Sequence, residues 1–369
     1  MQESEGLEGP LPRHPARGIR SSGRAVRHGR SLKVSARPLR AAVIGVGHLG
    51  RVHAKIYHKN PGSELAFVCD LDERRARSVA VEFDCQALGG VTDLPDDIDV
   101  VSIVVPTTEH AAIAEPLLER GVACLVEKPM AVDLEEADRI LAAAERGGAK
   151  LAVGHVERFQ PGVRKVHELG MRPRFIECHR LAQFSFRSTD VSVVHDLMIH
   201  DLDLVLDLMG CDPVEVDAVG GKILTESEDI ASVRLIFEDG GRANVSASRV
   251  SLKPMRRFRL FSNTGYVSLD FQENQGLLVQ RGPGWEKFFE TAQDRDPSEQ
   301  ASQASLLMAG VFQPVPLELG GEERPLQAEL DSFLANVRED TTPEVTGRDG
   351  RRALELAERI TEQIQRAGW

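Results

Sequence analysis

Residues 41–50 of the chain read Ala-Ala-Val-Ile-Gly-Val-Gly-His-Leu-Gly. The apolar run Ala41–Ile44 predicts a short buried strand, and a G-x-G-x-x-G pattern follows it directly. In this pattern Gly45 permits a tight turn, Gly47 lets the backbone approach a pyrophosphate, and Gly50 lets a helix pack closely on the sheet. That helix points its N-terminus at the phosphates. The stretch therefore predicts the first βα unit of a dinucleotide-binding fold.

A second predicted strand, Glu64–Cys69, ends at an acidic residue, Asp70. A carboxylate at this place accepts hydrogen bonds from ribose hydroxyls and repels a 2′-phosphate, so it favours NAD. The nearby Arg74 and Arg75 would tolerate NADP, whereas Asp72 adds further negative charge. We therefore expect NAD in preference to NADP.

Two different patterns divide the rest of the chain. Strands alternate with helices over residues 40–155, which predicts an α/β Rossmann domain with a doubly wound parallel sheet. Strands at 214–281 are joined by short turns, as antiparallel neighbours are, and helices at about Pro325–Val337 and Arg348–Gln365 close the chain. Residues 156–369 are therefore predicted to form an α+β domain with an open, largely antiparallel sheet.

The charge is distributed unevenly along the 369 residues. Residues 1–40 hold nine basic and three acidic residues, and the remainder carries a net charge of −18. An acidic body argues against nucleic acid as a partner, and no apolar run approaches the roughly 20 residues that span a bilayer. We expect residues 1–39 to be a disordered basic extension, with a targeting segment as the alternative.

Five cysteines are scattered through the chain without any Cys-x-x-Cys pair. This spacing indicates neither a disulfide framework nor a zinc ribbon. A reducing cytoplasm is the expected location.

Glu127-Lys128-Pro129 follows the apolar run Val122–Val126, which predicts a buried strand. A lysine at the carboxyl end of such a strand lies where open α/β sheets bind their ligands. A second loop, Pro106-Thr107-Thr108-Glu109-His110, ends another apolar strand. Either threonine can cap the helix that follows, and the same backbone would lie along the nicotinamide half of a cofactor.

A helix is predicted over residues 190–209, with Met198, Leu202, Val205 and Met209 on one face and Asp196, His200, Asp203 and Asp207 on the other. A carboxylate one turn before a histidine can orient the imidazole and stabilise its protonated form. Alternatively, Asp196 only favours the helix N-terminus and His200 is a satisfied or exposed histidine. His195 and His200 lie roughly 140° apart on a helix, so no metal site is expected.

Four motifs in this order resemble the Gfo/Idh/MocA family of NAD(P)-dependent sugar oxidoreductases. They are Gly45–Gly50, Glu127–Pro129, Gly154-His-Val-Glu-Arg-Phe-Gln-Pro161 and Asp196-x-x-x-His200-x-x-Asp203. The resemblance implies homodimers or homotetramers, formed through the open sheet. It also implies that His200 is the general acid/base, that Lys128 stabilises negative charge on the reacting oxygen, and that Asp196 orients the substrate or the imidazole.

The predicted cofactor contacts follow the motifs and the two loops. They are Gly45, Gly47, His48, Leu49, Gly50, Asp70, Pro106, Thr107, His110, Glu127 and Lys128. Relatives often carry glycine two residues before the histidine, where this chain has Met198, and we expect that difference to reshape the pocket.

The stretch from His179 to Asp196 resembles the subgroup of UDP-N-acetylglucosamine 3-dehydrogenases, which supply a 3-keto sugar for transamination in lipid A synthesis. Arg158 and Arg187 are candidates for binding the diphosphate, although either can instead make a structural ion pair. The resemblance thus implies oxidation of a sugar hydroxyl on a UDP-amino sugar. A dehydrogenase of free sugars or inositols and a non-catalytic dinucleotide-binding sensor or scaffold are the alternatives.

Overall fold

The computed structural model describes residues 37–185, 191–292, 306, 310–317, 319 and 324–369. The predicted basic extension therefore lies outside the described residues, except for its last three. Of these, Leu39 begins the first strand, and Arg37 forms an ion pair with Asp99 at 2.7 Å. Among the helices of the described segments, none is long and apolar enough to cross a membrane.

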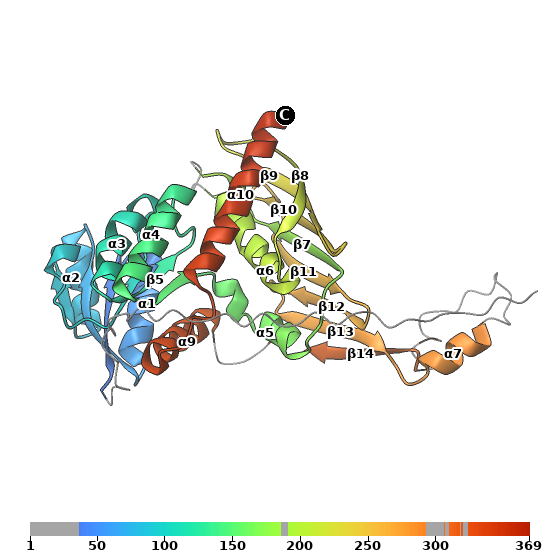
Figure 1. Ribbon diagram of the computed structural model, residues 1–369, viewed down its shortest axis with the longest axis horizontal. Coiled ribbons are helices and arrows are strands. Elements are labelled where there is room, and N and C mark those ends of the chain that lie inside the picture. The colour runs from blue at the N-terminus through green and yellow to red at the C-terminus, as the bar shows by residue number, and fades with distance from the viewer. Residues whose placement is uncertain (1–36, 186–190, 293–305, 307–309, 318, 320–323) are drawn as a thin grey trace, which may run out of the picture. The chain divides into compact units, whose positions relative to one another are not determined.

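The first domain contains a six-stranded parallel sheet covered by helices (Figure 1). Its elements are β1 (Leu39–Ile44), α1 (His48–Lys59), β2 (Ser63–Cys69), α2 (Glu73–Glu82), β3 (Gln86–Leu88), β4 (Val100–Ile103), α3 (His110–Glu119), β5 (Ala123–Glu127), α4 (Leu134–Gly147) and β6 (Leu151–Gly154). The strand order β3-β2-β1-β4-β5-β6 is that of a doubly wound nucleotide-binding sheet and confirms the predicted fold class. The order reverses between β1 and β4, so the ligand crevice is expected beyond the carboxyl ends of those strands.

The second domain is built on an eight-stranded sheet of order β14-β13-β12-β11-β7-β10-β9-β8. Its strands are β7 (Phe175–Leu181), β8 (Pro213–Gly221), β9 (Ile230–Phe237), β10 (Arg242–Ser248), β11 (Met255–Phe261), β12 (Gly265–Asp270), β13 (Gln275–Arg281) and β14 (Phe312–Leu317). Among the described strands of this sheet, only β7 and β10 pair in parallel, which confirms the largely antiparallel sheet.

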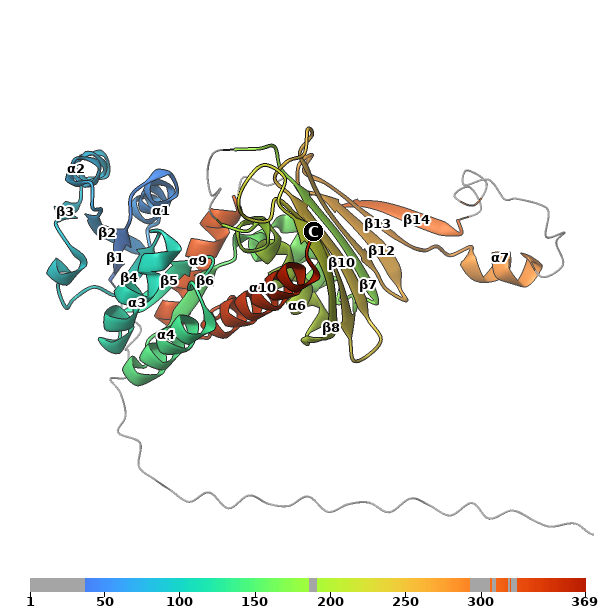
Figure 2. The same cartoon turned by 90° about the horizontal axis from the view of Figure 1, so that it is seen from above.

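Helices cover one face of this sheet. The helical elements after β6 are η3 (Val156–Phe159), α5 (Pro161–Glu168), the π turn η4 (Val194–Met198), α6 (Ile199–Met209), α7 (Trp285–Ala292), α9 (Pro325–Glu339) and α10 (Gly347–Ala367). Figure 2 shows α6 and α10 along one face, where Leu202, Val205 and Ile360 pack in one core with Val245 and Leu260. No helix of the described segments covers the opposite face.

Helix α9 packs with the first domain, although it follows the second in the sequence. Leu330, Phe333 and Leu334 on α9 share a hydrophobic core with Val43 and Tyr57 of the parallel sheet and its first helix. The expectation that both closing helices belong to residues 156–369 is therefore wrong for the packing of α9. Its apolar face matches the surface of the first domain, and sequence order does not reveal that match.

Candidate active site

The glycine loop fits a pyrophosphate. Gly45 has a φ of +82°, and a Cβ atom there would lie 2.2 Å from the carbonyl oxygen of Val104. A Cβ atom on Gly50 would lie 1.8 Å from the carbonyl oxygen of Gly45, whereas one on Gly47 would meet nothing within 4 Å. Gly47 also precedes α1 as its N-cap, and no side chain caps that helix. The backbone donors of His48 and Leu49 therefore begin a helix at an open space that suits an anion.

Asp70 lies at the end of β2, next to the glycine loop. The Val46 amide donates to its Oδ2 at 2.9 Å, and the Asp72 amide donates to its Oδ1 at 2.9 Å. Arg75 Nη1 lies 3.2 Å from the same carboxylate. The carboxylate thus fixes the loop and keeps negative charge beside it, while Arg75 offsets part of that charge.

The side chain of His110 lies inside the protein. Its side chain is 1% exposed, and its two ring nitrogens lie 3.0 Å from the carbonyl oxygens of Pro129 and Val105. The ring therefore links two loop backbones inside the protein, and the cofactor contact expected of this loop stays a prediction for its backbone. Pro106 and Thr107 remain at the surface of their loop, and neither threonine caps α3, whose N-cap is Glu109 without a side-chain bond.

Lys128 lies at the carboxyl end of β5, one strand from the switch point. Its Nζ donates to the backbone carbonyl oxygen of Asp196 at 2.8 Å and lies 3.7 Å from the Asp196 carboxylate. Burial lowers the pKa of this amine, and the neighbouring charges of Asp196 and Glu127 partly restore it. A cation is thereby held by one short contact at the edge of the predicted crevice.

The helix that carries Asp196 and His200 begins with a wider turn than predicted. The Ile199 amide donates to the Val194 carbonyl oxygen, five residues earlier, so residues 194–198 form a π turn. This turn changes the angle between Asp196 and His200, and no hydrogen bond joins the two side chains. The structure therefore gives no support to orientation of His200 by Asp196, and orientation of the substrate by Asp196 stays a prediction. Asp196 instead contacts Lys128.

His200 is held as a neutral imidazole by its surroundings. Its Nδ1 is buried and has no hydrogen-bond partner among the described residues. Burial lowers the pKa of His200 well below its ordinary 6.5, and the positive charges of Lys128 and Arg180 lower it further. A neutral histidine can accept the proton of a hydroxyl group. The lysine ammonium near it can then stabilise the negative charge on the hydroxyl oxygen.

Comparison with known proteins assigns this geometry to a family. The family model described as an oxidoreductase family with an NAD-binding Rossmann fold (Gfo/Idh/MocA) matches residues 39–155. The Gfo/Idh/MocA C-terminal domain matches residues 170–268. The UDP-N-acetylglucosamine 3-dehydrogenase of Acidithiobacillus ferrooxidans is 44% identical over 247 residues, which is 67% of this chain and 78% of the relative. The chain belongs to the Gfo/Idh/MocA family.

Several similar proteins match most of the chain. A solved structure of the Acidithiobacillus enzyme is 36% identical, with a TM-score of 0.78, and covers 89% of this chain and 98% of that chain. The inositol 2-dehydrogenase of Rhizobium meliloti is 26% identical over 88% of this chain and 97% of its own length. Levoglucosan dehydrogenase, solved with NADH and levoglucosan, has a TM-score of 0.74 over 90% of this chain and 98% of its own. At 19% identity it shows only the shared fold.

The family assignment confirms an NAD-dependent dehydrogenase that acts on CH–OH groups. It favours an enzyme over a non-catalytic sensor or scaffold. No cluster of three or more potential metal-binding side chains occurs in the part of the chain that the structure describes.

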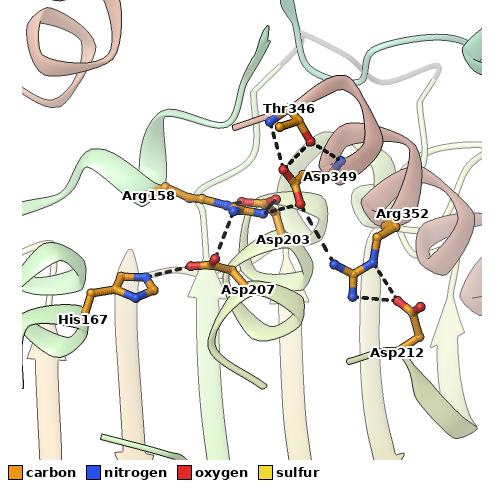
Figure 3. Close-up of polar contacts among 8 residues, drawn as sticks. All are labelled: Arg158, His167, Asp203, Asp207, Asp212, Thr346, Asp349 and Arg352. Carbon is orange, nitrogen blue, oxygen red and sulfur yellow. Dashed lines mark hydrogen bonds and ion pairs between the residues drawn. The ribbon is translucent and has the colours of Figure 1, made fainter. Parts of the chain in front are cut away.

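Arg158, a diphosphate candidate, lies in a buried cluster of ion pairs. The residues of this cluster come from η3, α6 and α10, which are far apart in the sequence (Figure 3). Its guanidinium makes two hydrogen bonds to Asp203, at 2.6 and 2.8 Å, and one to Asp207 at 3.0 Å. It also lies 3.7 Å from Asp349 at the start of α10, and its side chain is 7% exposed. The structural ion pair is therefore the alternative that the geometry favours. Arg187, the second candidate, lies outside the described residues.

Further charged groups near His200 were not given a role from the sequence. Buried Arg180 makes two hydrogen bonds to Asp201 and one to Glu157, which also pairs with Arg256. Arg256 has a side chain 31% exposed, and its charge also lowers the pKa of His200. Nothing in the spacing along the chain brings Glu157 and Arg256 together, because the contact depends on how η3 meets β11.

Two more residues complete the surroundings of the site. His155, 1% exposed, has two ring nitrogens without a hydrogen-bond partner among the described residues, and burial lowers its pKa. Met198 is fully buried in the core of the second domain. Its side chain fills core volume, and its effect on the shape of the pocket stays a prediction.

Proposed function

We propose that this dehydrogenase oxidises the C3 hydroxyl of UDP-N-acetylglucosamine to a ketone. The observation that carries the proposal is its 44% identity to an enzyme named for that reaction. A structural match of 36% identity over 98% of that enzyme supports the transfer across both domains. The arrangement of Lys128 and His200 supports the chemistry.

Each side chain has one task in this proposal. Neutral His200 accepts the proton of the reacting hydroxyl, and the Lys128 ammonium stabilises the negative charge that develops on the oxygen. Asp196 holds the Lys128 amine through its carbonyl oxygen. NAD, when bound, supplies the hydride acceptor, and the glycine loop, Asp70 and the 106–107 loop would hold it. Arg187 and Arg256 are proposed to bind the diphosphate in place of Arg158.

A substrate screen tests the proposal. NADH formation is followed at constant NAD with UDP-N-acetylglucosamine, UDP-glucose, free N-acetylglucosamine, glucose and myo-inositol, with an aminotransferase present to remove the ketone. We expect kcat/KM for UDP-N-acetylglucosamine to exceed that for the free sugars by orders of magnitude, because only a nucleotide sugar reaches the diphosphate contacts. Equal or faster turnover of free N-acetylglucosamine would contradict the proposal.

A dehydrogenase of inositol or free sugars is the second candidate. The 26% identity to inositol 2-dehydrogenase over 349 residues favours it. In the same screen this candidate predicts turnover of myo-inositol or glucose and none of any UDP-sugar.

We further propose that the enzyme is a cytoplasmic homodimer or homotetramer that supplies lipid A synthesis with its 3-keto sugar. All five cysteines are free thiols, as a reducing compartment requires. No helix of the described segments covers the second face of the second sheet, and a partner chain on that face would agree with the assembly that the family resemblance implies. Light scattering should give two or four times the 40.5 kDa of one chain. A monomer at micromolar concentration would contradict the assembly.

A further inference from the structure

A line of buried polar groups runs from the first helix to the residue before Lys128. Tyr57 Oη lies 2.8 Å from Ser102 Oγ, and Ser102 Oγ lies 3.1 Å from His53 Nδ1. His53 Nε2 lies 3.3 Å from Glu127 Oε1. Tyr57, Ser102 and His53 are each 0% exposed. The line therefore connects α1, β4 and β5 through the interior of the first domain.

One assignment of protons fits the two hydrogen bonds of this line. Tyr57 donates to Ser102, and Ser102 donates to His53 Nδ1, which leaves the ring proton on His53 Nε2. Nε2 lies 3.3 Å from Glu127 Oε1, although without the geometry of a hydrogen bond. Burial raises the pKa of Tyr57, so its hydroxyl stays protonated at the start of the line. Two hydrogen bonds in a low-dielectric interior thus hold the His53 ring beside the Glu127 carboxylate.

The Glu127 carboxylate is also enclosed on another side. Glu127 on β5 is paired in register with Gly154 on β6. A Cβ atom on Gly154 would lie 2.8 Å from Glu127 Cδ and 2.8 Å from its Oε2. Any larger residue at 154 would displace the carboxylate. Glu127 is thus fixed between a histidine and a strand position that has no side chain.

The line cannot serve as a route for protons to solvent, because it ends at the fully buried Tyr57. Instead, the line of polar groups affects the positions of Glu127 and Lys128. The Lys128 amide donates to Glu127 Oε2 at 3.3 Å, and the next side chain along the strand end is the Lys128 amine. The charge of Glu127 also raises the pKa of Lys128 against the effect of burial.

We propose that His53 is a positioning residue: it fixes the Glu127 carboxylate, which in turn sets the place and the charge of the Lys128 amine. His53 lies on α1, the helix that begins at the glycine loop. The proposal thus links the cofactor helix to the catalytic strand end. It rests on the proposed role of Lys128 in the dehydrogenase reaction.

Two substitutions at one position separate positioning from packing. His53→Asn places an amide near the Nδ1 position and keeps the Ser102 contact, whereas His53→Gln places one near Nε2 and keeps the Glu127 contact. Each variant loses one buried contact, so each serves as the other's control for stability. We expect His53→Asn to lower kcat at least about tenfold and His53→Gln to stay within about threefold of wild type. NAD affinity and KM should change by less than about threefold in both.

Gly154→Ala is an independent variant at the other side of the carboxylate. It should lower kcat as His53→Asn does, because it displaces Glu127 without touching His53. Losses of kcat that follow the melting temperature in both His53 variants, or full kcat in His53→Asn, would overturn the proposal.

A further measurement does not depend on the sugar. The pH dependence of Lys128 acetylation by acetic anhydride, read by mass spectrometry in the protein without substrate, gives the pKa of the amine. We expect Glu127→Gln to lower that pKa relative to wild type, because a neutral amide removes the charge that raises it. An unchanged pKa would overturn the link from Glu127 to Lys128 even if the screen of sugars had failed.

Discussion

Lys128 is a cation that the fold keeps partly out of water, with its amine on the Asp196 carbonyl oxygen. We expect Lys128→Ala to lower kcat by about 10²–10³-fold, the usual loss when a donor to a developing oxyanion is removed. NAD affinity should change little, because the glycine loop and Asp70 lie on other strand ends. Steady-state kinetics and titration of the protein with NAD measure both quantities. A collapse of NAD binding would show that Lys128 holds the cofactor.

The pH dependence of kcat/KM follows from two residues with lowered pKa values. His200 must be neutral to accept a proton, and burial lowers its pKa well below 6.5. Lys128 must be charged, and burial lowers its pKa below 10.5. Activity should therefore persist as the pH falls below 6.5 and disappear before the pH rises to 10.5. A profile of kcat/KM from pH 4 to 11 tests this, and an acid limb at or above pH 6.5 would contradict it.

Residues whose position depends on local backbone geometry were predictable from the sequence. Gly45, Gly50 and Lys128 belong to this group, because strand ends and tight turns leave a pattern in the sequence. The partner of Asp196 was not predictable, since a π turn arises from packing around the helix and has no sequence signature. The side-chain position of His110 was missed for a similar reason: its two carbonyl partners come from separate loops.

Substitutions of two glycines in the turn between β1 and α1 should have different effects, one on NAD binding and the other on stability. A methyl group on Gly47 has room in the free protein but would fill the space that suits a pyrophosphate. We expect Gly47→Ala to keep the wild-type melting temperature and to raise the Kd for NAD at least about tenfold. Gly50→Ala is the contrasting variant, because its methyl group would meet the Gly45 carbonyl oxygen. It should lower the melting temperature, and equal stability of the two variants would contradict this account.

The contact between η3 and α6 depends on Arg158. Removing its charge in Arg158→Met leaves Asp203, which is 0% exposed, without its main partner. We expect a loss of about 3–5 kcal/mol in the free energy of unfolding, and a smaller loss in the double variant Arg158→Met/Asp203→Leu. Denaturant unfolding measures both. A stable Arg158→Met variant with a greatly raised KM for the nucleotide sugar would restore the diphosphate role.

Helices and strands were easier to predict than the elements against which they pack. The alternation of strands and helices gave the parallel sheet, and short turns gave the antiparallel one. The short strand β3 and the packing of α9 were not predicted. A strand of three residues leaves little pattern, and the apolar face of a helix does not state which domain it covers.

Across the whole molecule, one buried carboxyl group should make stability depend on pH. Glu329 on α9 is 3% exposed, and neither carboxyl oxygen has a hydrogen-bond partner among the described residues. Burial raises its pKa well above 4.5, so the folded protein holds a proton that the unfolded chain releases. Its contribution to stability is full below about pH 4.5 and falls by up to about 1.4 kcal/mol per pH unit until the raised pKa is passed.

Glu329→Gln keeps the shape of the protonated acid without a proton to lose. The melting temperature of this variant relative to wild type should therefore rise as the pH increases from 5 to 8. Thermal unfolding at several pH values measures the difference. A difference that stays constant over this range would mean that Glu329 is already ionised in the folded protein.

The return of α9 to the first domain affects how the protein folds during synthesis. The ribosome completes β6 at Gly154 long before it reaches Leu330, Phe333 and Leu334, which cover the same core. At about 5–20 residues per second, roughly 10–40 s separate the two events. For that time the nascent parallel sheet displays an apolar surface that its own residues cannot cover. The part of the chain made first is thus among the last to be finished.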